Sequence, residues 1–185
     1  MYKRQVQQAW LQDIEPFDMP RVSKLAHINV TQKGNEYWST LHWIEMNQAR
    51  KPMDDKRFRQ AVMYAIDREF IVKRIMFGLG TVSTGPFHRN TRFFDPNIKQ
   101  YPYDPKKAIA LLDEMGLKPD AKGVRVKLGL IPNPYGEMQR RIAEYTKQSL
   151  GKVGIAIDIE STDVGGWTCL LYTSDAADDL PCVDL

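Results

Sequence analysis

Residues 124–131 read VRVKLGLI and begin the part of the chain that decides the fold. Their apolar side chains alternate with polar or small ones, which predicts a β-strand because successive side chains point to opposite faces. The spacing of apolar residues over 137–150 predicts a helix closed by Gly151, and residues 155–160 alternate again. Strand, helix and strand in succession form a βαβ unit. We therefore predict an α/β fold in which the two strands are parallel and joined by a right-handed crossover.

The segment before this unit predicts a further helix and a long connection. Asp104 followed by Pro105 is a strong helix start, since the carboxylate caps the helix and proline fits its first position. An apolar stripe follows, and Gly116 ends the helix. Residues 81–103 contain three prolines and no regular pattern, which is typical of a functional or packing loop.

Two more helices are predicted upstream of that loop. Asp54 or Asp55 is a plausible N-cap for the first, and Asp67 for the second. Gly78 and Gly80 end the second helix. The apolar residues at helical spacing are Phe58, Val62, Ala65 and Ile66 in the first helix, and Phe70, Ile71, Ile75 and Met76 in the second.

The sequence of residues 9–47 predicts mainly extended structure. Residues 9–19 predict a short helix or strand followed by a turn. Residues 26–31 alternate and are β-branched, which predicts a strand, and a turn at 34–35 leads to a longer predicted strand over 37–47. This longer strand carries the most informative side chains.

Trp43, Glu45 and Asn47 are the candidate ligand-binding residues. The period of two places them on one face of the predicted strand. An aromatic ring, a carboxylate and an amide together are unusual for a core, and they suit a cleft wall that stacks on a ligand and hydrogen-bonds it. The alternative is a solvated strand face with one packed tryptophan. Trp167 and the loop at Gly85-Pro86 are weaker candidates for ligand contact. A packed indole explains Trp167 equally well, and a turn explains Gly85-Pro86.

Composition limits the function classes. The 185 residues are 43% hydrophobic and 26% charged, typical of a globular protein, and no apolar run approaches the length of about 20 residues that spans a bilayer. The net charge is +3, but basic residues are interspersed with acidic ones, as in the run DDKR at 54–57. This pattern favours a mixed solvated surface over a nucleic-acid-binding face.

Motifs for catalysis, metals and cofactors are absent from the sequence. His27, His42 and His88 lack metal-ligand spacing. The glycines of 78–80 lack the Lys-Ser/Thr of a phosphate loop, and no Gly-x-Ser-x-Gly elbow occurs. We therefore expect no enzyme, no bound metal and no cofactor.

Residues 51–68, KPMDDKRFRQAVMYAIDR, resemble the signature of the dipeptide, oligopeptide and nickel solute-binding proteins of ABC importers. The likeness extends over nearly all of 6–168, in matching order and spacing. Its other matching stretches are 78–80, 85–86, 101–105, 107–108, 111–112, 116–117, the unit 124–150, 153–155 and 161–167.

The resemblance implies a two-lobe periplasmic-binding-protein fold in which the ligand is enclosed between the lobes. In that case 6–50 are crossing strands leading into the C-terminal lobe, 51–168 are part of this lobe, and the N-terminal lobe is missing. In oligopeptide binders, aromatic residues and a glutamate on the strand corresponding to 37–47 line the cleft. The residue that anchors the peptide's amino group lies further downstream than this chain extends.

The implied function is capture of a peptide-like small solute and its delivery to ABC permease subunits. The resemblance implies a monomeric protein without nucleic-acid partners, located in the periplasm or lipid-anchored outside the cell, although no signal sequence opens this chain. One alternative is a non-peptide solute, such as an oligosaccharide, an opine or a metal chelate. Another is an enzyme lobe or a basic nucleic-acid-binding module.

The two ends of the chain resemble translated DNA of a sequencing adapter. Residues 1–5 and 169–185 match opposite orientations of one short element, so we interpret both as artefacts. Cys169 and Cys182 lie in the second segment, and we therefore infer no disulfide from their number. We expect 169–185 to pack poorly against the rest.

Overall fold

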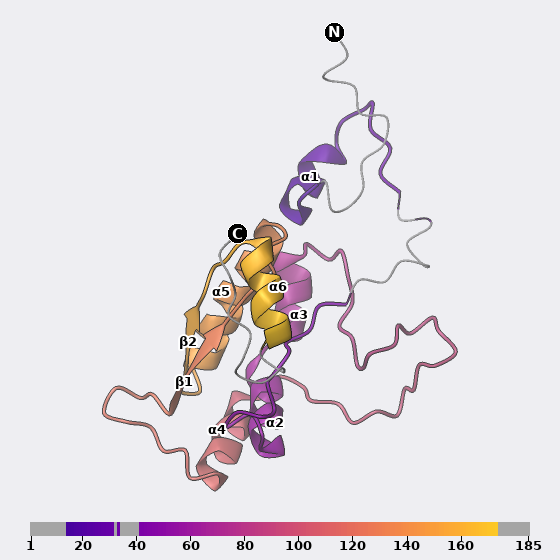
Figure 1. The fold of residues 1–185 in the computed structure, drawn as a ribbon. Helices are drawn as coiled ribbons and strands as arrows, with labels where there is room; N and C mark the ends of the chain where they lie inside the picture. Colours follow the sequence, from indigo (N-terminus) through magenta and orange to yellow (C-terminus); the bar gives the residue numbers. More distant parts are fainter. Residues whose placement is uncertain (1–13, 32, 34–40, 174–185) are drawn as a thin grey trace.

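A computed structural model describes residues 14–31, 33 and 41–173. Its elements, in chain order, are η2 (Pro16–Asp18), α1 (Met19–Val22), α2 (Lys56–Ala65), α3 (Arg68–Phe70), the π-helical turn η4 (Ile71–Ile75), α4 (Pro105–Glu114), β1 (Val126–Leu130), α5 (Glu137–Gly151), β2 (Ile155–Ile159) and α6 (Val164–Thr173). Figure 1 shows α1 at one end of the molecule and α4 at the other.

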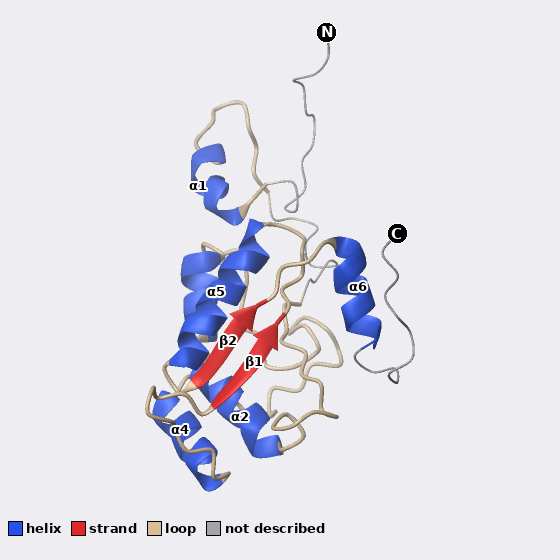
Figure 2. Ribbon diagram, turned by 60° about the vertical axis from the view of Figure 1, so that its left-hand side comes forward, coloured by secondary structure: helices blue, strands red, loops and turns tan. Residues whose placement is uncertain are grey.

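The predicted βαβ unit is confirmed. β1 and β2 are parallel and directly paired, with Val126 opposite Ile155 and Leu130 opposite Ile159. Helix α5 connects them and packs on β2, and Figure 2 shows α5 and α6 on opposite sides of the two strands. The α/β class expected from the sequence is therefore the class observed.

One glycine makes the tight return from α5 into β2. Gly154 has a φ of +87°, a left-handed conformation that favours glycine. A Cβ atom at this position would lie 2.9 Å from the carbonyl oxygen of Gly123. Gly151, expected to close the helix, is instead its last residue, and the turn into β2 covers residues 152–154.

The core forms where α2 and α4 pack against each other and, with α5, against the sheet. Its buried members are Phe58, Ala61, Val62, Tyr64, Ala65, Ile66, Ala108, Leu112, Leu150, Val153, Ile155 and Ile157. These residues include the whole apolar stripe predicted for α2. Of the stripe predicted for α4, Ala108 and Leu112 are buried, and Leu111 and Met115 are partly buried against the cluster. Removal of their apolar surface from water is the main force that holds the elements together.

Helices α2 and α4 run antiparallel and are joined at both ends. The backbone N–H of Asp104, the N-cap of α4, donates to the carbonyl oxygen of Tyr64 at 2.8 Å, near the end of α2. At the other end, Arg57 donates to the carbonyl oxygen of Glu114 at 3.3 Å. These two contacts fix the register of the helix pair.

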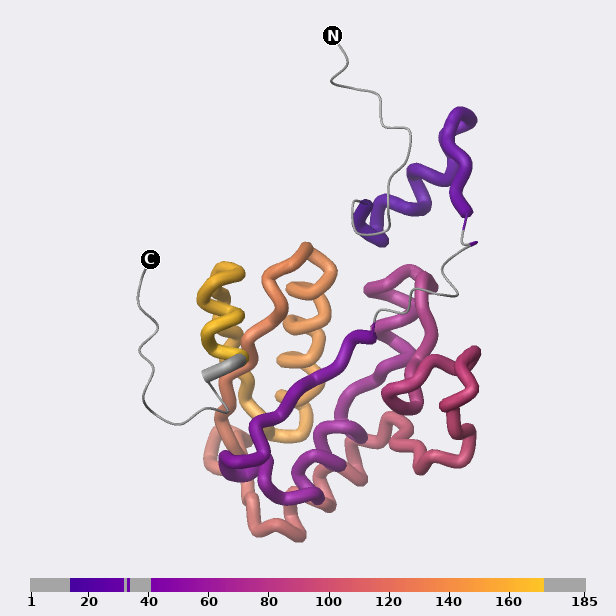
Figure 3. Tube along the Cα trace, turned by 45° about the vertical axis from the view of Figure 1, so that its right-hand side comes forward, coloured from indigo at the N-terminus to yellow at the C-terminus, as the bar shows by residue number. Residues whose placement is uncertain are grey.

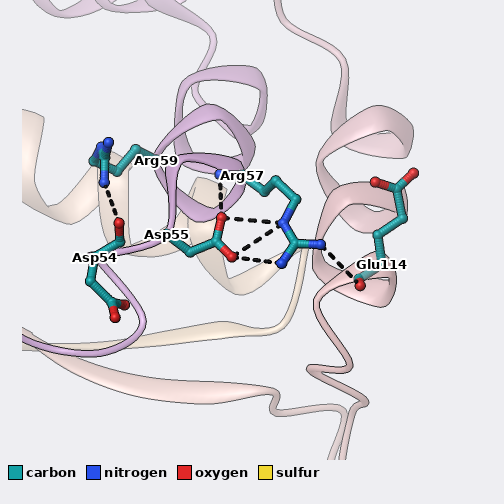
Figure 4. A network of polar contacts seen from close by, with 5 residues as sticks. All are labelled: Asp54, Asp55, Arg57, Arg59 and Glu114. Atoms are coloured by element: carbon teal, nitrogen blue, oxygen red, sulfur yellow. Dashed lines mark hydrogen bonds and ion pairs between the residues drawn. The ribbon is translucent and has the colours of Figure 1, made fainter.

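The polar residues of 51–68 stabilise the start of α2, as Figure 4 shows. Asp55 accepts from the backbone N–H of Arg57 at 2.7 Å and pairs with its guanidinium, which lowers the pKa of the carboxyl. The Arg59 guanidinium binds backbone carbonyl groups. It donates to the carbonyl oxygens of Met53 and Asp54, at 2.7 and 2.9 Å. The charged part of this signature therefore has a structural role.

All three predicted capping positions are confirmed. Asp55 caps α2, Asp67 accepts from the N–H of Phe70, and Asp104 accepts from the N–H of Lys107. The second predicted helix divides into α3 and η4, and Gly78, with a φ of +78°, follows its end. No helix or strand lies between η4 and α4, as predicted for 81–103.

Replacement of the α4 cap tests this local interpretation. We expect Asp104→Ala to lower the free energy of unfolding by about 1 kcal/mol, because the Lys107 amide loses its acceptor. Asp104→Asn retains a side-chain oxygen as the acceptor, so its free energy of unfolding should fall by only a fraction of that amount. Urea denaturation of the three proteins measures the difference, and equal losses for Ala and Asn would contradict the capping role.

The strands predicted in the first part of the chain are wrong where the structure describes them. Residues 26–31 form turns and irregular chain, and 41–47 run across the body without strand pairing (Figure 3). A strand needs a partner for its backbone hydrogen bonds, and the alternating pattern does not supply one. Of the short helix or strand predicted over 9–19, the described residues form the 3-10 turn η2, and α1 begins at the last of them and continues through Pro20, where a turn was expected. Residues 9–13 and 34–40 lie outside the described residues.

The structure shows no break at the proposed boundary after residue 168. Helix α6 continues across it, and in the described part of the tail Leu170 is 40% exposed while Cys169 and Leu171 are half-buried. Cys169 is disulfide-bonded, so the expectation of no disulfide is wrong. None of these three residues belongs to the buried core cluster, and the adapter origin of both ends stays a prediction.

Candidate functional site

The segment 41–47 presents two of its three candidate side chains to solvent. Trp43 is 72% exposed and Glu45 is exposed as well. Asn47 is half-buried, and its Oδ1 accepts from the backbone N–H of Ala49 at 2.9 Å. The structure thus leaves Trp43 and Glu45 accessible to a ligand, whereas Asn47 has a role in the turn that follows.

The alternate side chains of this segment attach it to the body. Met46 packs against the core cluster, and Nδ1 of His42 lies 3.2 Å from Nε2 of Gln139 on α5. Although His42 as a residue is exposed, desolvation of its ring lowers its pKa, and the Gln139 contact opposes that shift. The predicted alternation of faces therefore holds for His42 and Met46, whereas Ile44 is exposed.

The contact with Gln139 places the segment beside the carboxyl edge of the sheet. Because β1 and β2 are parallel, their carboxyl ends meet at one edge, where the loops 131–136 and 160–163 begin. Ligands of open α/β sheets bind outside this edge. We consider Trp43, Glu45 and this edge together as the candidate site.

Sequence reasoning missed one residue of this edge. Tyr135 is 61% exposed in the loop between β1 and α5, and its backbone N–H donates to Oδ1 of Asn133 at 2.9 Å. The signal was available, because an exposed aromatic ring after a parallel strand is a usual component of a binding surface. From the sequence we selected no residue between the strand 124–131 and the helix 137–150.

The first turn of α5, which follows the loop 131–136, carries three charged side chains. Arg140 and Arg141 both donate to the carboxylate of Glu137, at 2.6 to 3.2 Å. These hydrogen bonds, with that of Arg140 the stronger, lower the pKa of Glu137 to about 2. The carboxylate therefore remains ionised at neutral pH.

The other candidates lie in structural settings. The loop holding Gly85-Pro86 is fixed at its base by Arg68, which donates to the carbonyl oxygens of Ser83 and Tyr101 at 3.1 and 2.8 Å. Trp167 is half-buried in α6, and its backbone N–H donates to the carbonyl oxygen of Asp163 at 2.8 Å. Local structure accounts for both positions.

Two open pockets, of about 400 and 430 Å³, lie away from these candidates. The first is lined by residues that include Lys122, Arg125 and Lys152, and the second by residues that include Lys51, Met115 and Val126. Val126 begins β1 and Lys152 follows α5, so both pockets lie toward the amino edge of the sheet. Neither pocket is lined by Trp43, Glu45 or Asn47.

Within residues 14–31, 33 and 41–173, no three His, Cys, Asp or Glu side chains gather where they could hold a metal ion. No helix in those ranges combines the length and apolar character needed to cross a membrane.

The fold and the candidate edge define an α/β protein whose accessible side chains suit ligand binding. Residues 3–175 match the family described as bacterial extracellular solute-binding proteins, family 5 Middle, and the chain belongs to this family. The match covers the 51–68 signature and extends into both terminal segments.

Individual relatives agree with this assignment. The chain is 30% identical to the dipeptide-binding protein of Escherichia coli strain K12, over 81% of this chain and 27% of the relative. It is 32% identical to the glutathione-binding protein GsiB of Pectobacterium atrosepticum, over 69% of this chain and 24% of the relative. The chain thus spans about a quarter of the length of these curated relatives.

Solved structures support the fold. The oligopeptide-binding protein of Thermus thermophilus, complexed with a pentapeptide, matches with a TM-score of 0.57 and 31% identity, covering 60% of this chain and 20% of that protein. NikZ of Campylobacter jejuni, in complex with Ni(L-His), matches with a TM-score of 0.61 and 26% identity, covering 64% and 25%. The chain is therefore part of a periplasmic-binding-protein fold, as predicted.

Proposed function

We propose that the complete protein captures a peptide-like small solute outside the cytoplasmic membrane and delivers it to the permease subunits of an ABC importer. Its action is binding and release, without catalysis. The observation that carries this proposal is the pair of accessible side chains, Trp43 and Glu45, on an extended segment beside the carboxyl edge of the sheet. The dipeptide- and glutathione-binding relatives support the ligand class.

The chemistry of the pair fits such a ligand. An indole face stacks on planar groups and attracts cations, and a carboxylate accepts from an ammonium or an amide. Among the described residues Glu45 forms no ion pair, so its acceptor capacity is available. A surface of this kind becomes selective when a second lobe covers the ligand and excludes water.

The proposed mechanism is closure of two lobes by a hinge motion around the ligand. This chain supplies one wall, and the opposite wall belongs to the remainder of the protein. We propose that the complete protein is a monomer without a nucleic-acid partner, periplasmic or lipid-anchored. Asn47 is retained as a proposed ligand contact, beside its role in the turn that follows.

A metal chelate is the second candidate ligand, because one structural relative was solved with Ni(L-His). Such a complex carries an amino-acid portion that Trp43 and Glu45 could contact in the same way as a peptide. Among the described residues no cluster would bind the ion directly, so recognition would pass through the organic part of the chelate.

Calorimetry on two proteins tests the proposed function. We expect the complete protein to bind one of four probes, a dipeptide, a pentapeptide, glutathione or Ni(L-His), at least roughly a hundredfold more tightly than the present chain does, because half a cleft loses the opposing contacts. Tight binding by the chain alone would contradict the two-lobe mechanism. No binding of any probe by the complete protein would contradict the ligand class.

A further inference from the structure

A carboxylate from the beginning of the described chain caps helix α5. Oε1 of Glu15 accepts from the backbone N–H of Glu137 at 2.9 Å, in a partly buried setting. The N-cap position of α5 is Gly136, which has no side chain to serve as a cap. Glu15 therefore supplies, from 122 positions away, an acceptor that the local sequence does not provide.

The shape of the N-cap fits this arrangement. Gly136 has a φ of +94°, and a Cβ atom there would lie 3.2 Å from Oε1 of Glu15. Glycine both adopts this conformation and leaves the carboxylate room to approach. Two residues further on, the ring of Phe17 lies 4.6 Å from the guanidinium carbon of Arg141, a second contact between the same segment and α5.

The electrostatics of the helix end also suit this contact. The amino end of a helix carries a partial positive charge, which suits a carboxylate as the acceptor. The adjacent Glu137 carboxylate would repel Glu15, but it is paired with Arg140 and Arg141. The first turn of α5 thus accommodates a second carboxylate.

We propose that Glu15 is a positioning residue, and that Glu15, Phe17, Gly136, Glu137 and Arg141 form a clasp that holds segment 14–22 against the first turn of α5. This turn follows the loop at the carboxyl edge of β1, so the clasp couples the approaching chain to that edge. The clasp is independent of the proposed ligand, and it is a conformational device rather than a binding site. Loss of the Glu15 acceptor releases the segment while the core remains folded.

Hydrogen exchange of single amides tests the clasp in the present chain. We expect the Glu137 amide to exchange about tenfold or more faster in Glu15→Ala than in the unmodified chain, because a charge-assisted hydrogen bond is lost. Glu15→Gln, which retains an Oε1 acceptor, should restore most of the protection. Trypsin cleavage after Arg21 should accelerate in Glu15→Ala, since segment 14–22 is released.

The matched control is Asp18→Ala, which removes a carboxylate of the same segment that pairs with Arg21 instead of α5. It should leave Glu137 exchange unchanged, and the amides of β2 should remain protected in every variant. If Glu15→Ala does not fold, Glu15→Asp replaces it in the test. Its side chain is one methylene shorter, so the carboxylate no longer reaches the Glu137 amide, and this amide should exchange faster. Unchanged Glu137 protection in the folded variant, or no rescue by Gln, overturns the proposal.

Discussion

Phe58→Ala should lower the free energy of unfolding by about 3–5 kcal/mol, the range for removing a buried aromatic ring. Phe58 is 0% exposed and belongs to the core cluster at the α2–α4 interface. Because whole domains are stable by only about 5–15 kcal/mol, this one change should remove a large part of the total. Urea denaturation, followed by circular dichroism, measures the loss.

Phe93→Ala is the matched control for this substitution. The Phe93 ring is 59% exposed in the long loop, where it lies 5.7 Å from the ring of Phe87. This substitution deletes the same atoms as Phe58→Ala, but the Phe93 ring is already largely in contact with water in the folded chain. We therefore expect the free energy of unfolding to change by no more than about 0.5 kcal/mol. Similar losses for both variants would show that α2 and α4 do not form the packed centre of the fold.

Local chemistry explains why these parts were predictable from the sequence. Asp55, Asp67 and Asp104 each cap a helix through an amide two or three residues away, so the signal and the structure lie in the same short stretch. The same is true of β1 and β2, because the helix between them brings the strands together. In such cases the sequence pattern contains both partners of the interaction.

Non-local contacts were not predictable in this way. The alternation over 41–47 identified which side chains share a face, but a strand also needs a neighbouring backbone, and the described structure pairs none with this segment. His42 contacts Gln139 at a separation of 97 positions, and Glu15 caps α5 at a separation of 122. Nothing in the short-range pattern around Glu15 or Gly136 indicates that they meet.

The candidate site was partly predictable for the same reason. Residue types and a period of two were sufficient to select Trp43 and Glu45, and their exposure agrees with the expected open face. The involvement of Asn47 in a turn depends on how the chain continues to Ala49, and the position of Tyr135 depends on the parallel sheet. Both required the three-dimensional arrangement.

The ligand face gives the second large expected effect. In the complete protein, we expect Trp43→Ala and Glu45→Ala each to weaken solute binding by about tenfold or more. Aromatic stacking contributes about 0.5–1.5 kcal/mol beyond the area that it buries, and a hydrogen bond to a charged group about 1.5–3 kcal/mol. Neither side chain belongs to the core, so the thermal midpoint without ligand should stay within a few degrees. Calorimetry with the probe that the unmodified protein binds measures both affinities.

The control for this face lies within the same segment. Ile44 is 39% exposed and lies between the two candidates in the sequence. The period of two predicts that its side chain points to the other side of the segment. Ile44→Ala should therefore leave affinity nearly unchanged, which separates loss of a ligand contact from general disturbance of 41–47. If Trp43→Ala and Glu45→Ala bind like the unmodified protein, this face is not the site, although family membership is unaffected because it rests on the match over residues 3–175. If Ile44→Ala weakens binding equally, the segment acts by its position rather than through Trp43 and Glu45.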